Sequence, residues 1–136
     1  MELVVVTGPG RAPAWADAAC EDWGRRIQRT FPFRITEKLP KLSGRARIVA
    51  LDERGESRTS EGFAELLEAG ARVGAHPLVF VIGGPYGLDP EVRAAAWKLV
   101  RLSDLVLNHA VARVLLVEQL YRACSIRTGS PYHHGD

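Results

Sequence analysis

The feature of this sequence that most constrains its fold is an unbroken apolar run, Leu78–Ile82 (LVFVI). A strand with one face in water alternates apolar and polar side chains, whereas a central strand of a parallel sheet is covered on both faces and is apolar throughout. The run therefore predicts a central strand. Because strand and helix patterns alternate around it, we expect an α/β fold with a mainly parallel sheet.

Further strands are predicted from β-branched and apolar runs that end at turn residues. They cover Glu2–Thr7, Phe33–Leu39, Arg47–Leu51 and Leu102–Leu107. Seven residues separate the second of these from the third, fewer than the dozen or so that a helical crossover needs. We therefore expect these two segments to be antiparallel neighbours, or not both strands.

Helices are predicted where apolar residues recur with helical spacing. The stripes are Trp15, Ala19, Trp23 and Ile27 in a helix from Pro13 to about Thr30, and Phe63, Leu67 and Ala71 in a helix that Ser60 can cap. A third helix is expected from Asp89 to about Val100, since Asp89-Pro90-Glu91 combines a cap, a first-turn proline and a first-turn acid.

The last predicted helix, His109–Ile126, is apolar nearly all round. Such a helix is buried on more than one side. A chain of 136 residues has little with which to cover both sides. A second copy of the chain is the natural cover, so a homodimer is expected.

Composition indicates one globular domain over residues 1–136, since 46% of the residues are apolar and 25% are charged. No apolar run approaches the roughly 20 residues of a membrane helix, and Leu3–Val6 is too short for the apolar core of a signal peptide. Cys20 and Cys124 lie far apart without Cys-x-x-Cys spacing. This indicates a reducing, cytoplasmic setting and argues against a structural zinc site.

Basic residues are concentrated in one part of the chain. Between Arg25 and Arg47 there are eight basic side chains and one acid, Glu37. A concentrated basic stretch is typical of a surface that binds a polyanion such as RNA. A solvated helix face followed by a basic loop explains it equally well.

Ligands of parallel sheets bind beyond the carboxyl ends of the strands. Three segments are expected there: the one after Leu51, the glycine loop at residues 83–88, and the one from Leu107 into His109. Paired glycines let backbone groups approach a ligand such as a neutral adenine ring, although they also occur in simple tight turns. Gly8-Pro9-Gly10 lacks the third glycine of a dinucleotide-binding loop.

Several polar residues have both a functional and a structural interpretation. His109 opens the last helix and can donate or accept a proton, or serve only the structure. Arg122 lies four residues after Glu118, the spacing of an ion pair within a helix. Tyr132 and His133 lie near the chain end, where segments are often inert. His133 with His134 resembles a casual metal site at most, so no metal is expected.

Four motifs occur in the order VFVIGGPYGL (79–88), His109 with Arg113, EQLYRA (118–123) and Pro131-Tyr132-His133. Together they resemble the ribosomal RNA large subunit methyltransferase H family, from about Ile48 to His133 and more weakly over the first strand and helix. That family consists of small SPOUT-class enzymes that use S-adenosylmethionine. The resemblance implies a parallel sheet with helices on both faces and a C-terminal trefoil knot, a rare exception to unknotted topology.

The resemblance also implies a homodimer that methylates N3 of a pseudouridine in 23S rRNA on assembled ribosomes. The methyl donor would contact Leu51, Gly83, Leu102, Ser103, Asp104, Leu105, Val106 and Leu107. The positions that face the substrate, and are expected to be catalytic, match His109, Arg122, Tyr132 and His133.

The chain departs from the family pattern in three places. Pro40–Arg45 replaces a helix between the second and third strands, Asn108 stands where a proline is usual, and Val106 stands where a threonine is usual. The missing helix leaves the local sheet order and the RNA target open. Two alternatives therefore remain: a SPOUT methyltransferase with a different RNA target, and a catalytically silent dimer that binds RNA or ribosomes.

Overall fold

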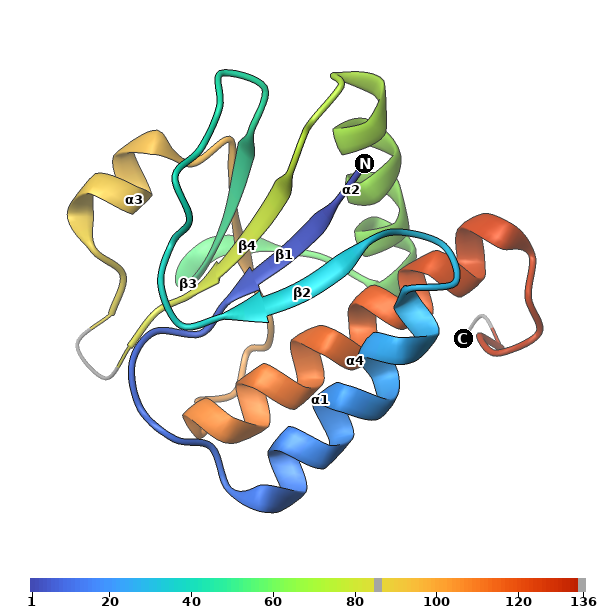
Figure 1. Cartoon of the computed structure of the whole chain (residues 1–136), viewed down its shortest axis with the longest axis horizontal. Coiled ribbons are helices and arrows are strands. Elements are labelled where there is room, and N and C mark those ends of the chain that lie inside the picture. Colours follow the sequence, from blue (N-terminus) through green and yellow to red (C-terminus); the bar gives the residue numbers. More distant parts are fainter. Residues whose placement is uncertain (85–86, 135–136) are drawn as a thin grey trace.

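The computed structural model of the chain describes residues 1–84 and 87–134. Within these residues, strands form one parallel sheet in the order β2-β1-β4-β3-β5 (Figure 1). Their bounds are β1 Leu3–Val6, β2 Phe33–Thr36, β3 Arg47–Ser57, β4 Leu78–Ile82 and β5 Lys98–Arg101. All five residues of β4 are buried between β1 and β3. The predicted α/β fold and its central strand are confirmed.

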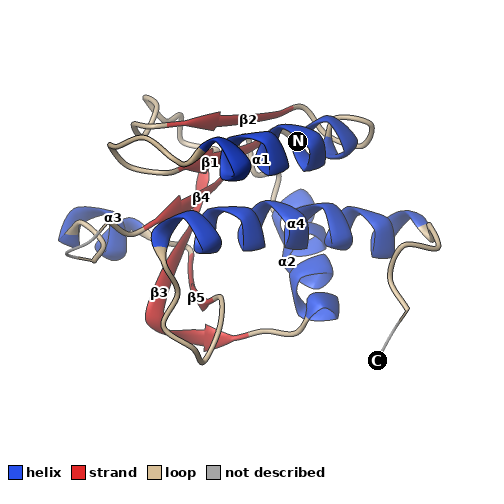
Figure 2. Cartoon of the chain, turned by 90° about the horizontal axis from the view of Figure 1, so that it is seen from below, coloured by secondary structure: helices blue, strands red, loops and turns tan. Residues whose placement is uncertain are grey.

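Helices cover the two faces of the sheet unequally. The helices are α1 Ala14–Ile27, α2 Ser60–Arg72, α3 Pro90–Ala95 and α4 His109–Thr128. Alternate side chains of the central strands, such as Val5 and Phe80, pack in a large core with α1, α2 and α4, while Val4 and Val79 point to a smaller core near α3. Figure 2 shows α1 and α4 lying side by side on one face, with α3 apart from them.

The connection between β2 and β3 overturns both expectations for these segments. Both are strands, both are parallel, and β1 and β4 lie between them. Residues 37–46 return to the start of β3 without a helix, and Leu42 packs against the smaller core. Three strand spacings and the length of β2 amount to roughly 20 Å, whereas ten extended residues reach roughly 33 Å. An extended segment therefore makes the crossover.

The region after β4 differs from the prediction. Helix α3 ends at Ala95 instead of near Val100, and the last strand is Lys98–Arg101, not residues 102–107. The buried position of this strand is Val100, which is 0% exposed, whereas Val106 in the predicted strand is 95% exposed. The sequence LSDLVL has strand-like composition, but it forms a loop beyond the sheet.

Two helices present other faces to the core than their stripes predicted. Trp15 is 55% exposed, and α1 buries Ala16, Cys20 and Gly24, each one position further on than predicted, together with Ile27, which is buried as predicted. In α2, Phe63 and Leu67 are buried as predicted, but Gly70 takes the place of Ala71. The cap of α2 is Thr59, whose side chain accepts a hydrogen bond from the Gly62 amide. Within the described residues, no helix is long and apolar enough to cross a bilayer.

Candidate functional site

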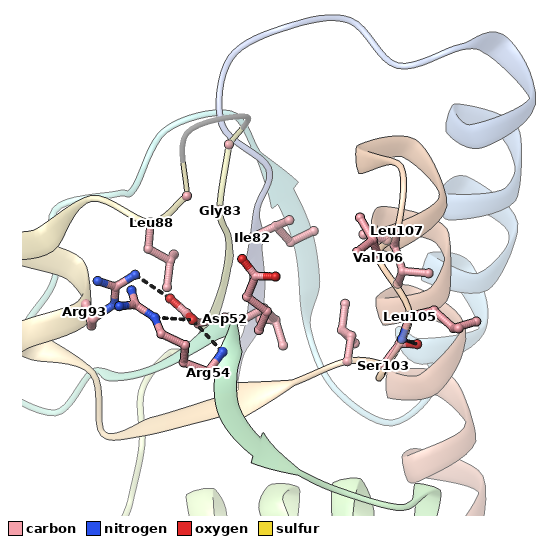
Figure 3. A pocket seen from close by; sticks show the side chains of 16 residues that line it. Asp52, Arg54, Ile82, Gly83, Leu88, Arg93, Ser103, Leu105, Val106 and Leu107 are labelled. Carbon is pink, nitrogen blue, oxygen red and sulfur yellow. Dashed lines mark hydrogen bonds and ion pairs between the residues drawn. The ribbon is translucent and has the colours of Figure 1, made fainter.

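A first pocket of about 520 Å³ opens at the carboxyl end of β4 and beside residues 51–54 of β3, where β3 ceases to pair with β4 (Figure 3). Seven of the eight residues expected to contact a methyl donor line it: Leu51, Gly83, Leu102, Ser103, Leu105, Val106 and Leu107. The eighth, Asp104, lies outside the lining, is 79% exposed and forms a 3.0 Å ion pair with Arg101. The three segments that the sequence placed beyond the strands thus meet around one cavity.

The glycine loop forms one wall of the first pocket. Gly84 and Gly87 exchange backbone hydrogen bonds of 2.9 and 3.2 Å, and Gly87 has a φ of +89°. A Cβ atom on Gly83 would lie 3.1 Å from backbone atoms of Gly87 and Leu88. Gly83, Gly84 and Gly87 therefore form part of the pocket wall. Pro85 and Tyr86 of the predicted motif lie outside the described residues.

The opposite wall is the loop at residues 102–107, which exposes apolar side chains. Leu105 is 75% exposed and Val106 is 95% exposed. The Ser103 hydroxyl accepts a 2.9 Å hydrogen bond from the Leu105 amide and fixes the turn. Apolar surface of this kind at the mouth of a pocket indicates a place where a ligand or a second protein binds.

The sequence analysis missed the charged side of the first pocket. Asp52, Arg54 and Arg93 all line it, on the side away from the apolar loop (Figure 3). The Asp52 carboxylate is 5% exposed and pairs with both arginines. Asp52 could have been found, because it directly follows Leu51 at the end of a core strand, where ligands bind; Arg93 lies 41 positions away.

Asp52 is held in its charged form. Burial alone would raise the pKa of its carboxyl, but the hydrogen bond from the Arg54 amide and those from the Arg93 and Arg54 side chains outweigh burial. The pKa of Asp52 therefore lies below its ordinary value. A fixed carboxylate with two guanidinium groups can bind the sugar hydroxyls or the charged end of a ligand, while the apolar wall accepts a ring.

The predicted catalytic residues fall into two groups, one at the N-terminus of α4 and the other near its C-terminal end. His109 is the first residue of the helix, next to Asn108, whose side chain accepts a 2.8 Å hydrogen bond from the Ala110 amide. Arg122, Tyr132 and His133 lie together 13 residues further along, roughly 20 Å at 1.5 Å per residue. One chain therefore does not bring His109 together with the other three.

The second group belongs to a set of side chains, here called the tail cluster, in which the chain end folds back on α1 and α4. Its members are Trp23, Glu118, Tyr121, Arg122, Tyr132 and His133. The ion pair between Arg122 and Glu118 is present at 2.8 Å, so the structural interpretation of that pair is confirmed. The described tail is thus packed on its own chain.

Tyr132 and His133 are both engaged within the tail cluster. The Tyr132 hydroxyl donates a 2.9 Å hydrogen bond to Glu118, and burial together with this carboxylate raises the pKa of Tyr132. Arg122 donates to Nδ1 of His133, whose Nε2 lies 2.8 Å from a Glu61 oxygen. Since arginine only donates and a carboxylate only accepts, Nε2 carries the ring proton in this arrangement.

The basic stretch is partly neutralised. Arg25 and Arg26 pair with Glu21 and Asp22 on their own helix, and Arg34 pairs with Glu2. In the described part of the chain the remaining five basic residues of the stretch form no ion pair: Arg29, Lys38, Lys41, Arg45 and Arg47. The charge available to a polyanion therefore lies mainly on the segment between β2 and β3.

The sequence of this chain matches a known class of proteins over most of its length. The family described as predicted SPOUT methyltransferase matches residues 34–133 of this chain. A solved structure described as a probable methylase family protein from Haemophilus influenzae Rd KW20 superposes with a TM-score of 0.54. It is 13% identical and covers 96% of this chain and 67% of that chain, which supports the fold.

Curated relatives define the family more narrowly. The ribosomal RNA large subunit methyltransferase H of Verminephrobacter eiseniae is 42% identical over 157 residues, with 98% of this chain and 99% of the relative covered. That of Paracidovorax citrulli is 41% identical with the same coverage. The chain belongs to the ribosomal RNA large subunit methyltransferase H family. The alignments are longer than the 136 residues of this chain, so it lacks residues that the relatives have.

Proposed function

We propose that the protein is an S-adenosylmethionine-dependent methyltransferase of ribosomal RNA that methylates N3 of a pseudouridine in 23S rRNA on the ribosome, in the cytoplasm. The observation that carries the proposal is the first pocket, where β3 and the loops that follow β4 and β5 surround a cavity of about 520 Å³. Family membership supports the same reaction class, since the relatives are named as large subunit rRNA methyltransferases. The whole chain, residues 1–136, would be one SPOUT domain with a C-terminal trefoil knot.

The first pocket fits the donor in size and in chemistry. Backbone groups of Gly83 and Leu107 would hold the adenine ring, while Leu105 and Val106 would cover its faces. Asp52 would accept hydrogen bonds from sugar hydroxyls, and Arg93 would hold the donor's carboxylate. S-adenosylmethionine supplies a methyl group on a sulfonium sulfur, which leaves as a neutral thioether when N3 of the base takes the methyl.

The catalytic groups would come together in a homodimer. Val111 of α4 is 43% exposed, and Val114 and Leu115 are only partly covered by their own chain. Pairing along this side would cover them. The partner's tail could then bring a second set of Arg122, Tyr132 and His133 side chains beside His109. A site built from both chains resolves the separation of roughly 20 Å along α4.

The chemistry of these residues follows from the acidity of the base. A uridine-type N3 proton has a pKa near that of tyrosine, about 10, so N3 must be deprotonated for attack. His133 or His109 would accept this proton, and Arg122 would stabilise the negative charge that develops on the base. Tyr132 would stack on the base and hold it in line with the methyl group.

A methyltransferase with another RNA target is the second candidate. The observation that favours it is the crossover at residues 37–46, which has no helix and carries free basic side chains. A silent RNA-binding dimer is distinguished from both by donor binding, which such a protein does not need.

The test is mass-spectrometric mapping of methylated nucleotides in ribosomes incubated with the protein and S-adenosylmethionine. We expect one added methyl group on a pseudouridine of 23S rRNA. A methyl group on another nucleotide identifies the second candidate. Donor binding is measured separately by calorimetry, and absence of both binding and methylation would contradict the proposal.

A further inference from the structure

A second pocket of about 530 Å³ lies beside the first one, at the carboxyl ends of β1 and β2. The start of α4 separates the two cavities, because Ala112 lines the first and Arg113 lines the second. The second pocket is bounded by Thr7, Thr36 and the start of α1. The methyl-transfer proposal does not use it.

Arg113 is the unusual residue of this pocket. Its side chain is 9% exposed, and its Nε atom is buried without a hydrogen-bond partner among the described residues. The closest carboxylate is Asp17, whose oxygen lies 3.9 Å from an Arg113 nitrogen and is therefore beyond hydrogen-bond distance. A buried Nε–H group without an acceptor is costly. An anionic ligand in the pocket would supply acceptors to the end of this side chain.

Two further features of the pocket attract an anion. Helix α1 begins after Pro13, and no described side chain caps its first amides. The N-terminus of a helix carries partial positive charge and free amide donors. Arg11, which is exposed, lines the same cavity. Donors from two arginines and one helix end therefore converge on this pocket.

The pocket also contains acceptors. Asp17 and Glu37 both line it, and both are exposed. Their charges balance those of the two arginines, so a bare anion would meet repulsion as well as attraction. A group that is anionic at one end and donates hydroxyl hydrogen bonds at the other suits this mixture. A ribose-phosphate unit has that character, and its 2′-hydroxyl distinguishes RNA from DNA.

We propose that the second pocket binds a ribose-phosphate unit of the RNA substrate, a few nucleotides from the methylated base. The phosphate accepts hydrogen bonds from Arg113, Arg11 and the first amides of α1, and a sugar hydroxyl donates to a carboxylate. The inference rests on the proposed function, because it takes RNA to be the substrate. It adds a specific anchor to the diffuse charge of the basic stretch.

The test follows the Arg113 Nε–H and the Ala14 amide by nuclear magnetic resonance in the full-length protein. The probes are an octamer of uridylate RNA and the matching deoxyuridylate octamer. We expect both signals to move with RNA, and the DNA to bind at least threefold more weakly. Signals that do not move with RNA, or equal binding of both octamers, would overturn the proposal.

Two variants separate ligand binding from a structural role. Arg113→Met removes the unpartnered guanidinium but keeps apolar volume, so we expect an unchanged or raised thermal midpoint and RNA binding weakened about tenfold. Arg11→Gln should weaken RNA binding about threefold and lower the salt slope of binding by about 0.7. The control is Arg72→Gln, at the exposed end of α2. Unchanged RNA affinity in Arg113→Met, or equal losses in Arg11→Gln and Arg72→Gln, would overturn the proposal.

Donor titration on the same samples keeps the two proposals apart. Arg11 and Arg113 do not line the first pocket, so S-adenosylmethionine should bind both variants as it binds the unaltered protein. Failure of all samples to bind the donor would count against the proposed function alone, since the octamer signals decide the role of the second pocket independently.

Discussion

The two ends of α4 differ in how completely the side chains around them are covered or hydrogen-bonded by the same chain. At the first pocket, Leu105 and Val106 are exposed apolar residues that nothing in the described chain covers. At the tail cluster, Glu118 accepts hydrogen bonds from Arg122, Tyr132 and Gln119. Apolar surface at the first pocket is therefore available to a ligand or a partner, whereas the side chains of the tail cluster already have partners in their own chain.

The largest effect is expected from removal of the tail, residues 130–136. Methyl transfer should fall at least a hundredfold, because Tyr132 and His133 would be lost from the composite site. Donor binding should be unchanged, since the tail cluster lies roughly 20 Å along α4 from the first pocket. Methylation is measured by mass spectrometry and donor binding by calorimetry.

The matched control for the truncation lacks only residues 135 and 136 and should remain active. Light scattering should show the same oligomeric state for both truncated proteins as for the intact chain. Full methylation by the shorter protein would show that the tail is inert, and His109 would then be left to act without it.

A second expected effect tests the glycine wall of the first pocket. Gly83→Val should weaken donor binding more than tenfold, because a Cβ atom would press on backbone atoms of Gly87 and Leu88 at 3.1 Å. Gly44→Val is the matched control, since a Cβ there meets nothing within 4 Å and Gly44 does not line the first pocket. A donor affinity of Gly83→Val equal to that of the unaltered protein in calorimetry would show that the donor binds elsewhere.

The charged side of the first pocket should contribute to stability in a pH-dependent way. Asp52→Asn should lower the free energy of unfolding by about 1–3 kcal/mol at pH 7, because it removes charged hydrogen bonds from Arg93 and Arg54. The pKa of Asp52 is lowered in the folded protein, so its contribution is complete above the ordinary value of 3.8 and is lost as the pH falls through the folded value.

Urea unfolding of Asp52→Asn and of the unaltered protein at pH 7 and pH 3 measures this difference. We expect it to be smaller at pH 3 than at pH 7. Glu53→Gln, at the next position, is the control and should change stability little at either pH. A difference that does not depend on pH would mean that shape rather than charge sets the contribution of Asp52.

The smallest effect on stability is expected at the contact between His133 of the tail and Glu61 of α2. The hydrogen bond from His133 lowers the pKa of Glu61, but Glu61 is exposed to water, where such pairs contribute little to stability. Glu61→Gln should therefore leave the thermal midpoint almost unchanged at pH 7. A clear fall in the midpoint would show that the tail is firmly fixed on its own chain, which would contradict a tail that moves to a partner.

Local patterns in the sequence were enough to predict much of the fold. The run Leu78–Ile82 identified the central strand, since only a strand covered on both faces is apolar at every position. The cap and first-turn proline at residues 89–90 located the start of α3 correctly. The rule that ligands bind beyond the carboxyl ends of parallel strands located the three segments that meet at the first pocket. The motifs that indicated the family are also short stretches of sequence.

The remainder depended on contacts between residues far apart in the chain. Residues 98–107 contain two apolar stretches, and packing of Val100 on β3 rather than composition decided which one is a strand. The connection between β2 and β3 does not need a helix. A connection only has to be long enough to span the distance between the two strands, and an extended segment is long enough here. The pairing of Asp52 with Arg93 and the burial of Arg113 beside α1 also arise only when the chain has folded. The sequence by itself determined which segments are strands and helices at the centre, because burial on both faces requires an apolar residue at every position of a short segment. Only the tertiary structure decided which charged groups meet, because that depends on the order of the strands.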